Sequence, residues 1–165
     1  MSSVYITQGE TAVGSDKDMV ISTILGSCIS ICLWDPVAGV GGMNHLLLPG
    51  QMTGNDETST GAVAMDRLIN QMMPLGAERP RLHGKLFGGS SMLQGRTDIG
   101  SRNAEFGRNY LRNENIPCDA EDVGGNRARR LRFCPGTGVV HLKFVEEAPV
   151  LVEPKTEEAH GVELF

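Results

Sequence analysis

The sequence has no excess of positive charge: 15 Lys and Arg stand against 20 Asp and Glu, for a formal net charge of −5. A protein that binds nucleic acid through the phosphates needs a basic surface, so no nucleic-acid partner is expected. An acidic chain is also poorly suited to an anionic membrane surface. The charge balance therefore argues against both classes of partner.

Long apolar runs are missing too. No stretch approaches the roughly 18 apolar residues of a membrane-spanning helix. The first ten residues, MSSVYITQGE, lack the basic segment and apolar run of a secretory signal. We therefore expect a cytoplasmic protein without membrane insertion. Its four cysteines should then be free thiols, because thiols stay reduced in the cytoplasm.

Motifs for metals and cofactors are likewise lacking. Cys28 and Cys32 are separated by three residues, but on one extended stretch they lie about 13 Å apart, too far to share a zinc ion. His83, His141 and His160 have no partners at ligand spacing. The three Gly-Gly pairs do not precede a helix with the spacing of a phosphate-binding loop. We expect no metal and no cofactor.

Glycine is abundant, with 21 residues, which predicts many tight turns rather than long helices. Apolar and β-branched residues predict short strands, and spacing of three and four residues predicts two helices. The expected strands are 19–25, 29–34, 40–48, 82–87, 131–134 and 139–145, and the expected helices are 62–73 and 101–113. This pattern is typical of an α+β fold with a mixed or antiparallel sheet.

The chain is long enough for one domain with a sizeable core. From residue 146 onward it is acidic, contains Pro149 and Pro154, and shows neither helical nor strand periodicity. We therefore expect one domain over residues 1–145 and a loosely ordered tail over residues 146–165.

Cys28 follows Leu25, Gly26 and Ser27 at a glycine-marked break between two expected strands. Such a break can turn a side chain and a backbone N–H toward one point, which suits a nucleophile that needs an oxyanion donor. A cysteine between apolar residues can equally be a small core residue. Taken alone, this residue leaves both interpretations open.

His45 lies in an otherwise apolar strand and is the candidate base for Cys28. If Trp34 opposes Gly39 in the expected hairpin, Cys28 lies directly opposite His45. If Trp34 opposes Val40, His45 points to the other face unless a bulge restores the register. A neighbouring imidazolium would favour the reactive thiolate.

Four runs in this order resemble the CheD family, the chemoreceptor glutamine deamidases of bacterial chemotaxis. They are ILGSCISICLWDPVAGVGGMNHLLLP (24–49), KLFGGSSML (85–93), IGSRN (99–103) and EDVGGNRARRLRF (121–133). The resemblance implies a cysteine nucleophile at Cys28 and a histidine at His45, 17 residues later. The family's third residue can be a threonine six positions before the cysteine, which corresponds to Ser22 here, with the adjacent Thr23 as the alternative.

The resemblance also implies a fold like that of the glutamine-deamidating bacterial toxins, with mixed sheets packed together and helices outside. The implied reaction is hydrolysis of receptor glutamine side chains to glutamate by a Cys-His thiol mechanism, and some members also hydrolyse glutamyl methyl esters. Chemoreceptor cytoplasmic helices are then the substrate, and a CheC-type phosphatase is a further partner that some members bind. The alternative from another class is a non-catalytic binding module that regulates such a phosphatase.

Overall fold

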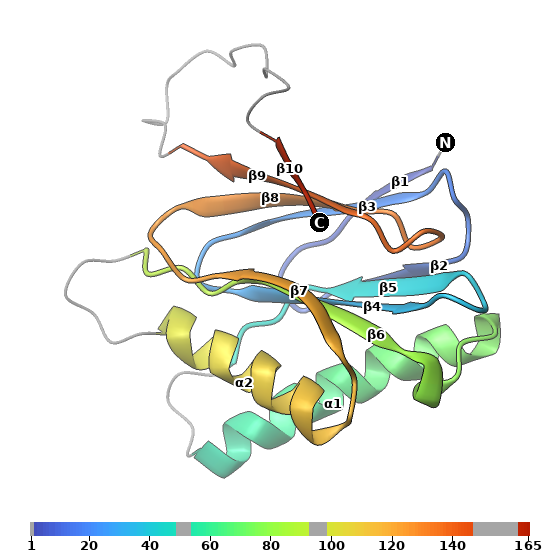
Figure 1. The fold of residues 1–165 in the computed structure, drawn as a ribbon. Coiled ribbons are helices and arrows are strands. Elements are labelled where there is room, and N and C mark those ends of the chain that lie inside the picture. Colours follow the sequence, from blue (N-terminus) through green and yellow to red (C-terminus); the bar gives the residue numbers. More distant parts are fainter. Residues whose placement is uncertain (1, 49–53, 93–98, 147–161) are drawn as a thin grey trace.

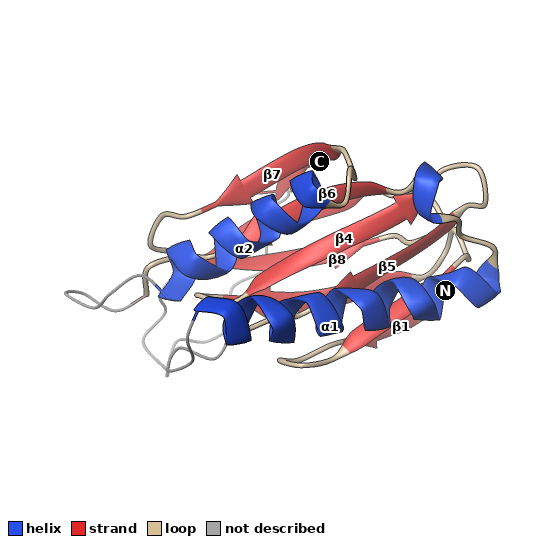
Figure 2. Cartoon of the chain, turned by 90° about the horizontal axis from the view of Figure 1, so that it is seen from below, coloured by secondary structure: helices blue, strands red, loops and turns tan. Residues whose placement is uncertain are grey.

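The computed structural model describes residues 2–48, 54–92, 99–146 and 162–165. Two five-stranded sheets pack face to face, and both helices cover the free face of one of them (Figures 1 and 2). We call the helix-covered sheet the central sheet and the other the outer sheet. The α+β class and the mixed, packed sheets expected from the sequence are confirmed.

The outer sheet has the strand order β1-β3-β8-β9-β10, and the central sheet has the order β2-β5-β4-β6-β7. The pairs β1–β3 and β6–β7 are parallel, and the other pairs are antiparallel. The outer strands are β1 (Ser3–Tyr5), β3 (Val20–Leu25), β8 (Ala128–Phe133), β9 (Val140–Val145) and β10 (Val162–Leu164). The central strands are β2 (Thr11–Gly14), β4 (Ile29–Asp35), β5 (Val40–Asn44), β6 (His83–Gly88) and β7 (Cys118–Val123).

Both helices pack on the central sheet. They are α1 (Gly54–Met72) and α2 (Ile99–Asn113), and two short 3₁₀ turns, Met73–Leu75 and Arg79–Arg81, follow α1. Within the described ranges, neither helix combines the length and apolar content needed to cross a bilayer. Each helix overlaps one expected from the sequence, although α1 begins earlier, at Gly54, and ends one residue earlier, at Met72.

The central sheet is buried on both faces, which explains why β4 reads as an almost continuous apolar run. Ile29, Ile31 and Leu33 face the helices, whereas Cys32 faces the outer sheet. The molecule therefore has two hydrophobic cores, one between the helices and the central sheet and one between the two sheets.

The outer sheet is buried on one face only, and its strands alternate accordingly. On β3, Ile21, Thr23 and Leu25 are fully buried between the sheets, while Ser22 and Ile24 lie on the opposite, solvent-facing side. This alternation decides which side chains of β3 can contribute to a site between the sheets.

The end of the chain differs from the expected loose tail. Residues 162–164 form β10, which pairs with β9, and Phe165 packs edge-on against Phe87 with the ring centroids 5.4 Å apart. Residues 147–161 lie outside the described part of the chain, so the expectation for them stays a prediction.

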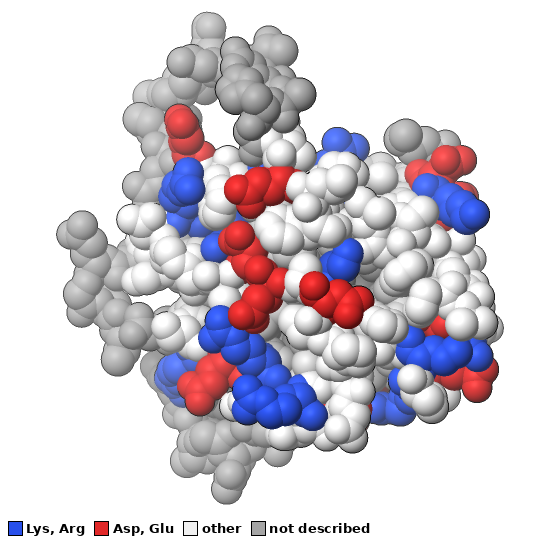
Figure 3. All heavy atoms as spheres, in the orientation of Figure 1, with Lys and Arg blue, Asp and Glu red and all other residues white. Residues whose placement is uncertain are grey.

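Charged side chains of both signs are interspersed on the face shown in Figure 3. The surface of the molecule carries exposed ion pairs, among them Arg108 with Glu121 at 3.0 Å and Arg79 with Asp66 at 3.1 Å. Exposed pairs of this kind contribute about 0–1 kcal/mol each. Stability therefore depends mainly on the two cores.

Candidate active site

The glycine-marked break before Cys28 is the point where the chain crosses between the sheets, because β3 belongs to the outer sheet and β4 to the central sheet. The turn at residues 26–28 lies against the end of β6. Gly89 N donates to Cys28 O at 2.9 Å, and Ser90 N donates to Gly26 O at 3.0 Å. Gly88 has a φ of 107°, and a Cβ there would lie 2.2 Å from Cys28 O. Only glycine allows this approach.

The pairing of β4 with β5 follows neither register expected from the sequence. Trp34 opposes Gly41, and Ile29 pairs with Leu46 through two backbone hydrogen bonds of 3.0 and 2.8 Å. In this register Cys28 falls beside Leu47, so it is a diagonal neighbour of His45 rather than its direct partner. The connection from Trp34 to its partner is two residues longer than in the first expected register and one residue longer than in the second, which shifts the pairing.

Cys28 and His45 nevertheless share a face. Cys28 packs against the core between the sheets, together with Cys32 and Met43. By strand alternation, His45 faces the same side as Met43. Diagonal neighbours on one face lie about 7–8 Å apart, within reach of an aromatic side chain. The structure thus brings the two predicted residues to one side of neighbouring segments.

The imidazole of His45 is held by a hydroxyl from the other sheet. Thr23 Oγ1 lies 2.7 Å from His45 Nδ1, and Thr23 Oγ1 also donates to Ile6 O at 2.7 Å. A hydroxyl has one proton to donate, and here the carbonyl of Ile6 takes it. His45 Nδ1 must therefore carry the hydrogen that Thr23 accepts. In this tautomer Nε2 is unprotonated and can accept a proton, as a general base must.

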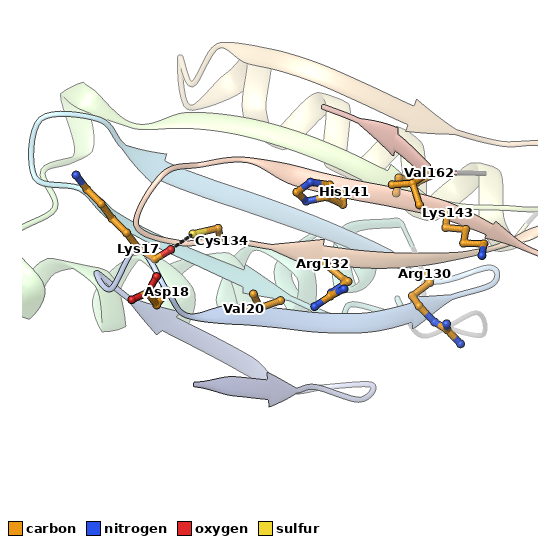
Figure 4. Close-up of a pocket in the computed structure, with 10 residues that line it drawn as sticks. Lys17, Asp18, Val20, Arg130, Arg132, Cys134, His141, Lys143 and Val162 are labelled. Atoms are coloured by element: carbon orange, nitrogen blue, oxygen red, sulfur yellow. Dashed lines mark hydrogen bonds between the residues drawn. The ribbon is translucent and has the colours of Figure 1, made fainter. Parts of the chain in front are cut away.

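Ser22, the residue favoured by spacing, points the other way. It pairs with Arg132 across β3 and β8, on the solvent-facing side of the outer sheet. That side carries a hollow of about 380 Å³ lined by residues that include Val20, Arg132 and His141 (Figure 4). The hydroxyl that contacts His45 belongs to Thr23, the alternative left open by the sequence.

Burial favours the neutral forms of both Cys28 and His45. It raises the pKa of Cys28 above the usual 9.0. It also lowers the pKa of His45 below the usual 6.5, and the carboxylate of Glu10 opposes this only in part. The thiolate–imidazolium pair expected from the sequence is therefore disfavoured at rest, because burial penalises both charges.

Glu10 is a residue that sequence reasoning missed. Its carbonyl accepts a hydrogen bond from His45 N at 3.1 Å, and its carboxylate accepts bonds from Thr7 N and Oγ1, both at 2.7 Å. The same loop supplies Gly9 N, which donates to His45 O at 2.8 Å. No motif around residues 7–10 marks this loop, since it meets His45 only in the folded chain.

Cys32 shares the core between the sheets with Cys28, whereas the described histidines other than His45 lie elsewhere. Cys32 is buried, and burial raises the pKa of its thiol. His83 pairs with Asp119 at 2.9 Å, and His141 is exposed on the outer sheet. His160 falls outside the described residues. Across the described ranges, no three His, Cys, Asp or Glu residues gather closely enough to hold a metal ion.

Comparisons with known proteins point to one family. Residues 47–144 match the family model described as "CheD chemotactic sensory transduction". A "Probable chemoreceptor glutamine deamidase CheD" from Zymomonas mobilis is 48% identical over 148 residues, covering 87% of this chain and 80% of that protein. Proteins with the same description from Caulobacter sp. and Cereibacter sphaeroides are 44% and 47% identical, covering 93% and 92% of this chain and 84% and 76% of theirs.

Among solved structures, Neisseria meningitidis protein NMB0706 has a TM-score of 0.47 and 10% sequence identity, covering 76% of this chain and 63% of that one. At this level of similarity it carries no argument about function.

Proposed function

Because the chain belongs to the CheD family, we propose that it is a chemoreceptor glutamine deamidase, which hydrolyses receptor glutamine side-chain amides to glutamate and ammonia. The observation that carries the mechanism is the bond from His45 Nδ1 to Thr23 Oγ1. It leaves Nε2 as a free base on the face that Cys28 shares. The proposed nucleophile is Cys28, and the proposed base is His45.

In the first half-reaction, the Cys28 sulfur attacks the side-chain carbonyl carbon of the substrate glutamine, and its proton passes to His45 Nε2. The imidazolium then returns this proton to the amide nitrogen, which leaves as ammonia. A thioester between Cys28 and the glutamyl group remains. Proton transfer during attack removes the need for a thiolate at rest, which suits the raised pKa of Cys28.

In the second half-reaction, His45 Nε2 takes a proton from a water molecule that attacks the thioester. The carbon–sulfur bond breaks, the glutamate side chain is released, and the proton returns to the Cys28 sulfur. The imidazolium formed in each half-reaction keeps its Nδ1–H on Thr23 and is favoured by the nearby Glu10 carboxylate. A glutamyl methyl ester would follow the same steps with methanol as the leaving group.

The proposed substrate is the cytoplasmic helical region of a chemoreceptor, which places the reaction in the cytoplasm. Binding of a CheC-type phosphatase stays a prediction from the family resemblance.

The test is to incubate the protein with a purified receptor cytoplasmic fragment. Released ammonia is measured, and the fragment is mapped by peptide mass spectrometry. We expect conversion of specific glutamines to glutamate, with one ammonia released for each. A fragment that contains these glutamines but remains unchanged would refute the proposed function.

A further inference from the structure

Asn103 is a fully buried polar residue on α2 with no role in the chemistry described above. Its Nδ2 donates to Ser27 O at 2.8 Å, and its Oδ1 accepts from Leu48 N at 3.0 Å. Ser27 immediately precedes Cys28, and Leu48 lies three residues after His45. One carboxamide therefore joins the turn that carries the nucleophile to the segment that carries the base.

Each of these two backbone segments lacks a complete set of strand partners. In the turn, the carbonyls of Gly26 and Cys28 accept from backbone amides after β6, and Asn103 supplies the donor for the carbonyl between them. Regular pairing of β5 ends at Asn44, and beyond it the isolated pair Ile29–Leu46 continues the ladder. Beyond this pair, the hydrogen bond from Leu48 N to Asn103 Oδ1 is the next one that holds the segment after His45.

The reach of this short side chain depends on an unusually close approach of α2 to the central sheet. Gly100 and Gly107 lie one turn on either side of Asn103, on the same face of the helix. A Cβ at Gly100 would lie 2.3 Å from Ser90 O, and one at Gly107 would lie 2.6 Å from Leu86 Cδ1. These glycines let the helix approach until the carboxamide spans both backbone segments.

We propose that Asn103 is a positioning residue for the deamidation reaction, because its carboxamide sets the Cys28 turn and the His45 segment at a fixed distance. This inference rests on the proposed function of the pair. A donor and an acceptor are both required, and among side chains of this size only a carboxamide supplies both at any pH. Small errors in the placement of a nucleophile and its base are costly for rate but not for binding.

The test compares Asn103→Asp and Asn103→Ala with a matched change, Asn109→Asp, at an exposed position of the same helix. In Asn103→Asp the acceptor for Leu48 N is kept, but an ionised carboxylate cannot donate to Ser27 O. We expect kcat on the receptor fragment to fall at least about 10-fold at about pH 8, with KM within about twofold. Asn109→Asp should match the wild-type protein.

A pH profile separates positioning from simple stabilisation. The protonated acid is isosteric with the amide and can donate to Ser27 O, so the activity of Asn103→Asp relative to wild type should recover as the pH is lowered. Asn103→Ala should show no such recovery. Activity per folded molecule that parallels wild type at all pH values for both variants would overturn the proposal.

Alkylation of Cys28 by iodoacetamide gives a second readout that needs no receptor. The rate for Asn103→Asp, measured by peptide mass spectrometry on folded protein, should depart from wild type at high pH and approach it at low pH. If the wild-type protein releases no ammonia, the proposed function fails on its own. An alkylation profile unchanged by Asn103→Asp overturns the positioning role separately.

Discussion

Ser22 and Thr23 are neighbouring hydroxyl residues on β3, and a shift of one position along the strand decides which of them can contact His45. Ser22 and Thr23 are adjacent, so they face opposite sides of the outer sheet, and Thr23 alone of the two contacts His45. Both faces of this strand carry apolar residues, with Val20 and Ile24 on one side and Ile21 and Leu25 on the other. The sequence pattern therefore could not show which face lies inside.

Loss of the Thr23 hydroxyl should impair the reaction because it orients the imidazole and selects its tautomer. We expect Thr23→Val to lower kcat/KM roughly 10- to 100-fold, or about 1.4–2.8 kcal/mol of transition-state stabilisation. Ser22→Ala should stay within about twofold, corresponding to less than about 0.5 kcal/mol. Both are assayed on one receptor fragment, with Thr23→Ser as the variant that restores the hydroxyl. A damaging Ser22→Ala beside a silent Thr23→Val would reverse the assignment.

The acid limb of the pH profile should report His45. A base must be neutral, so activity is lost as the pH falls through the pKa of His45, which burial holds below 6.5. The midpoint of this limb in kcat/KM should accordingly lie below 6.5. In Glu10→Gln the carboxylate that raises the pKa is gone, so the midpoint should move lower still. A midpoint that moves upward in this variant would contradict the electrostatic role of Glu10.

At the scale of elements, the sequence identified the strands around the site but not their partners. Each of the expected strands 19–25, 29–34, 82–87, 131–134 and 139–145 overlaps an observed strand, because local pattern and glycine breaks mark them. The strand β8, however, begins three residues earlier than expected, at Ala128. Pairing is a tertiary property, so the passage of the chain from the outer sheet to the central sheet at Gly26 was not predicted. The register of β4 with β5 was wrong for the same reason.

The strands β1, β2, β7 and β10 were missed because they are edge strands with little apolar alternation. In β7, the sequence CDAEDV has three acidic residues among six. Such a segment becomes a strand because β6 offers it a free edge, not because of its own propensity. The inner strands β4 and β6, which flank the Cys28 turn, carry a much stronger signal.

Gly88, at the end of β6, lies in close contact with the backbone of the Cys28 turn. Gly88→Ala introduces both a left-handed backbone strain, about 1 kcal/mol or more, and a clash with Cys28 O. Gly124→Ala is the matched control, because its φ is 86° but nothing lies within 4 Å of the added Cβ. We expect Gly88→Ala to lose more thermal stability and most of its activity. Equal losses of Tm and activity in the two variants would show that the contact with Cys28 is unimportant.

At the scale of the molecule, the last residues link the two sheets. Phe165 follows β10 of the outer sheet, and its ring contacts Phe87 of the central sheet. Phe165 O accepts from Lys85 Nζ at 3.0 Å and from Val140 N at 3.0 Å. A single aromatic residue beyond an acidic stretch gives no periodic signal, which is why the sequence predicted a loose end here.

Phe165→Ala should therefore destabilise the fold. Loss of a partly buried aromatic contact costs about 1–3 kcal/mol, which at this chain length corresponds to a fall in Tm of about 3–10 °C. Leu164→Ala is the control, because the neighbouring Leu164 is 69% exposed. Thermal unfolding followed by circular dichroism compares the two. An unchanged Tm for Phe165→Ala would mean that the end of the chain adds nothing to the packing of the sheets.

The central claim, that Cys28 is the nucleophile of an amidohydrolase, is tested most directly by ammonia release from a receptor fragment. Cys28→Ala should abolish release while leaving thermal unfolding close to that of the wild-type protein. Cys32→Ala, which changes the same residue type on the same face four positions along, should retain most of the activity. Continued ammonia release by folded Cys28→Ala at the wild-type rate would contradict the account.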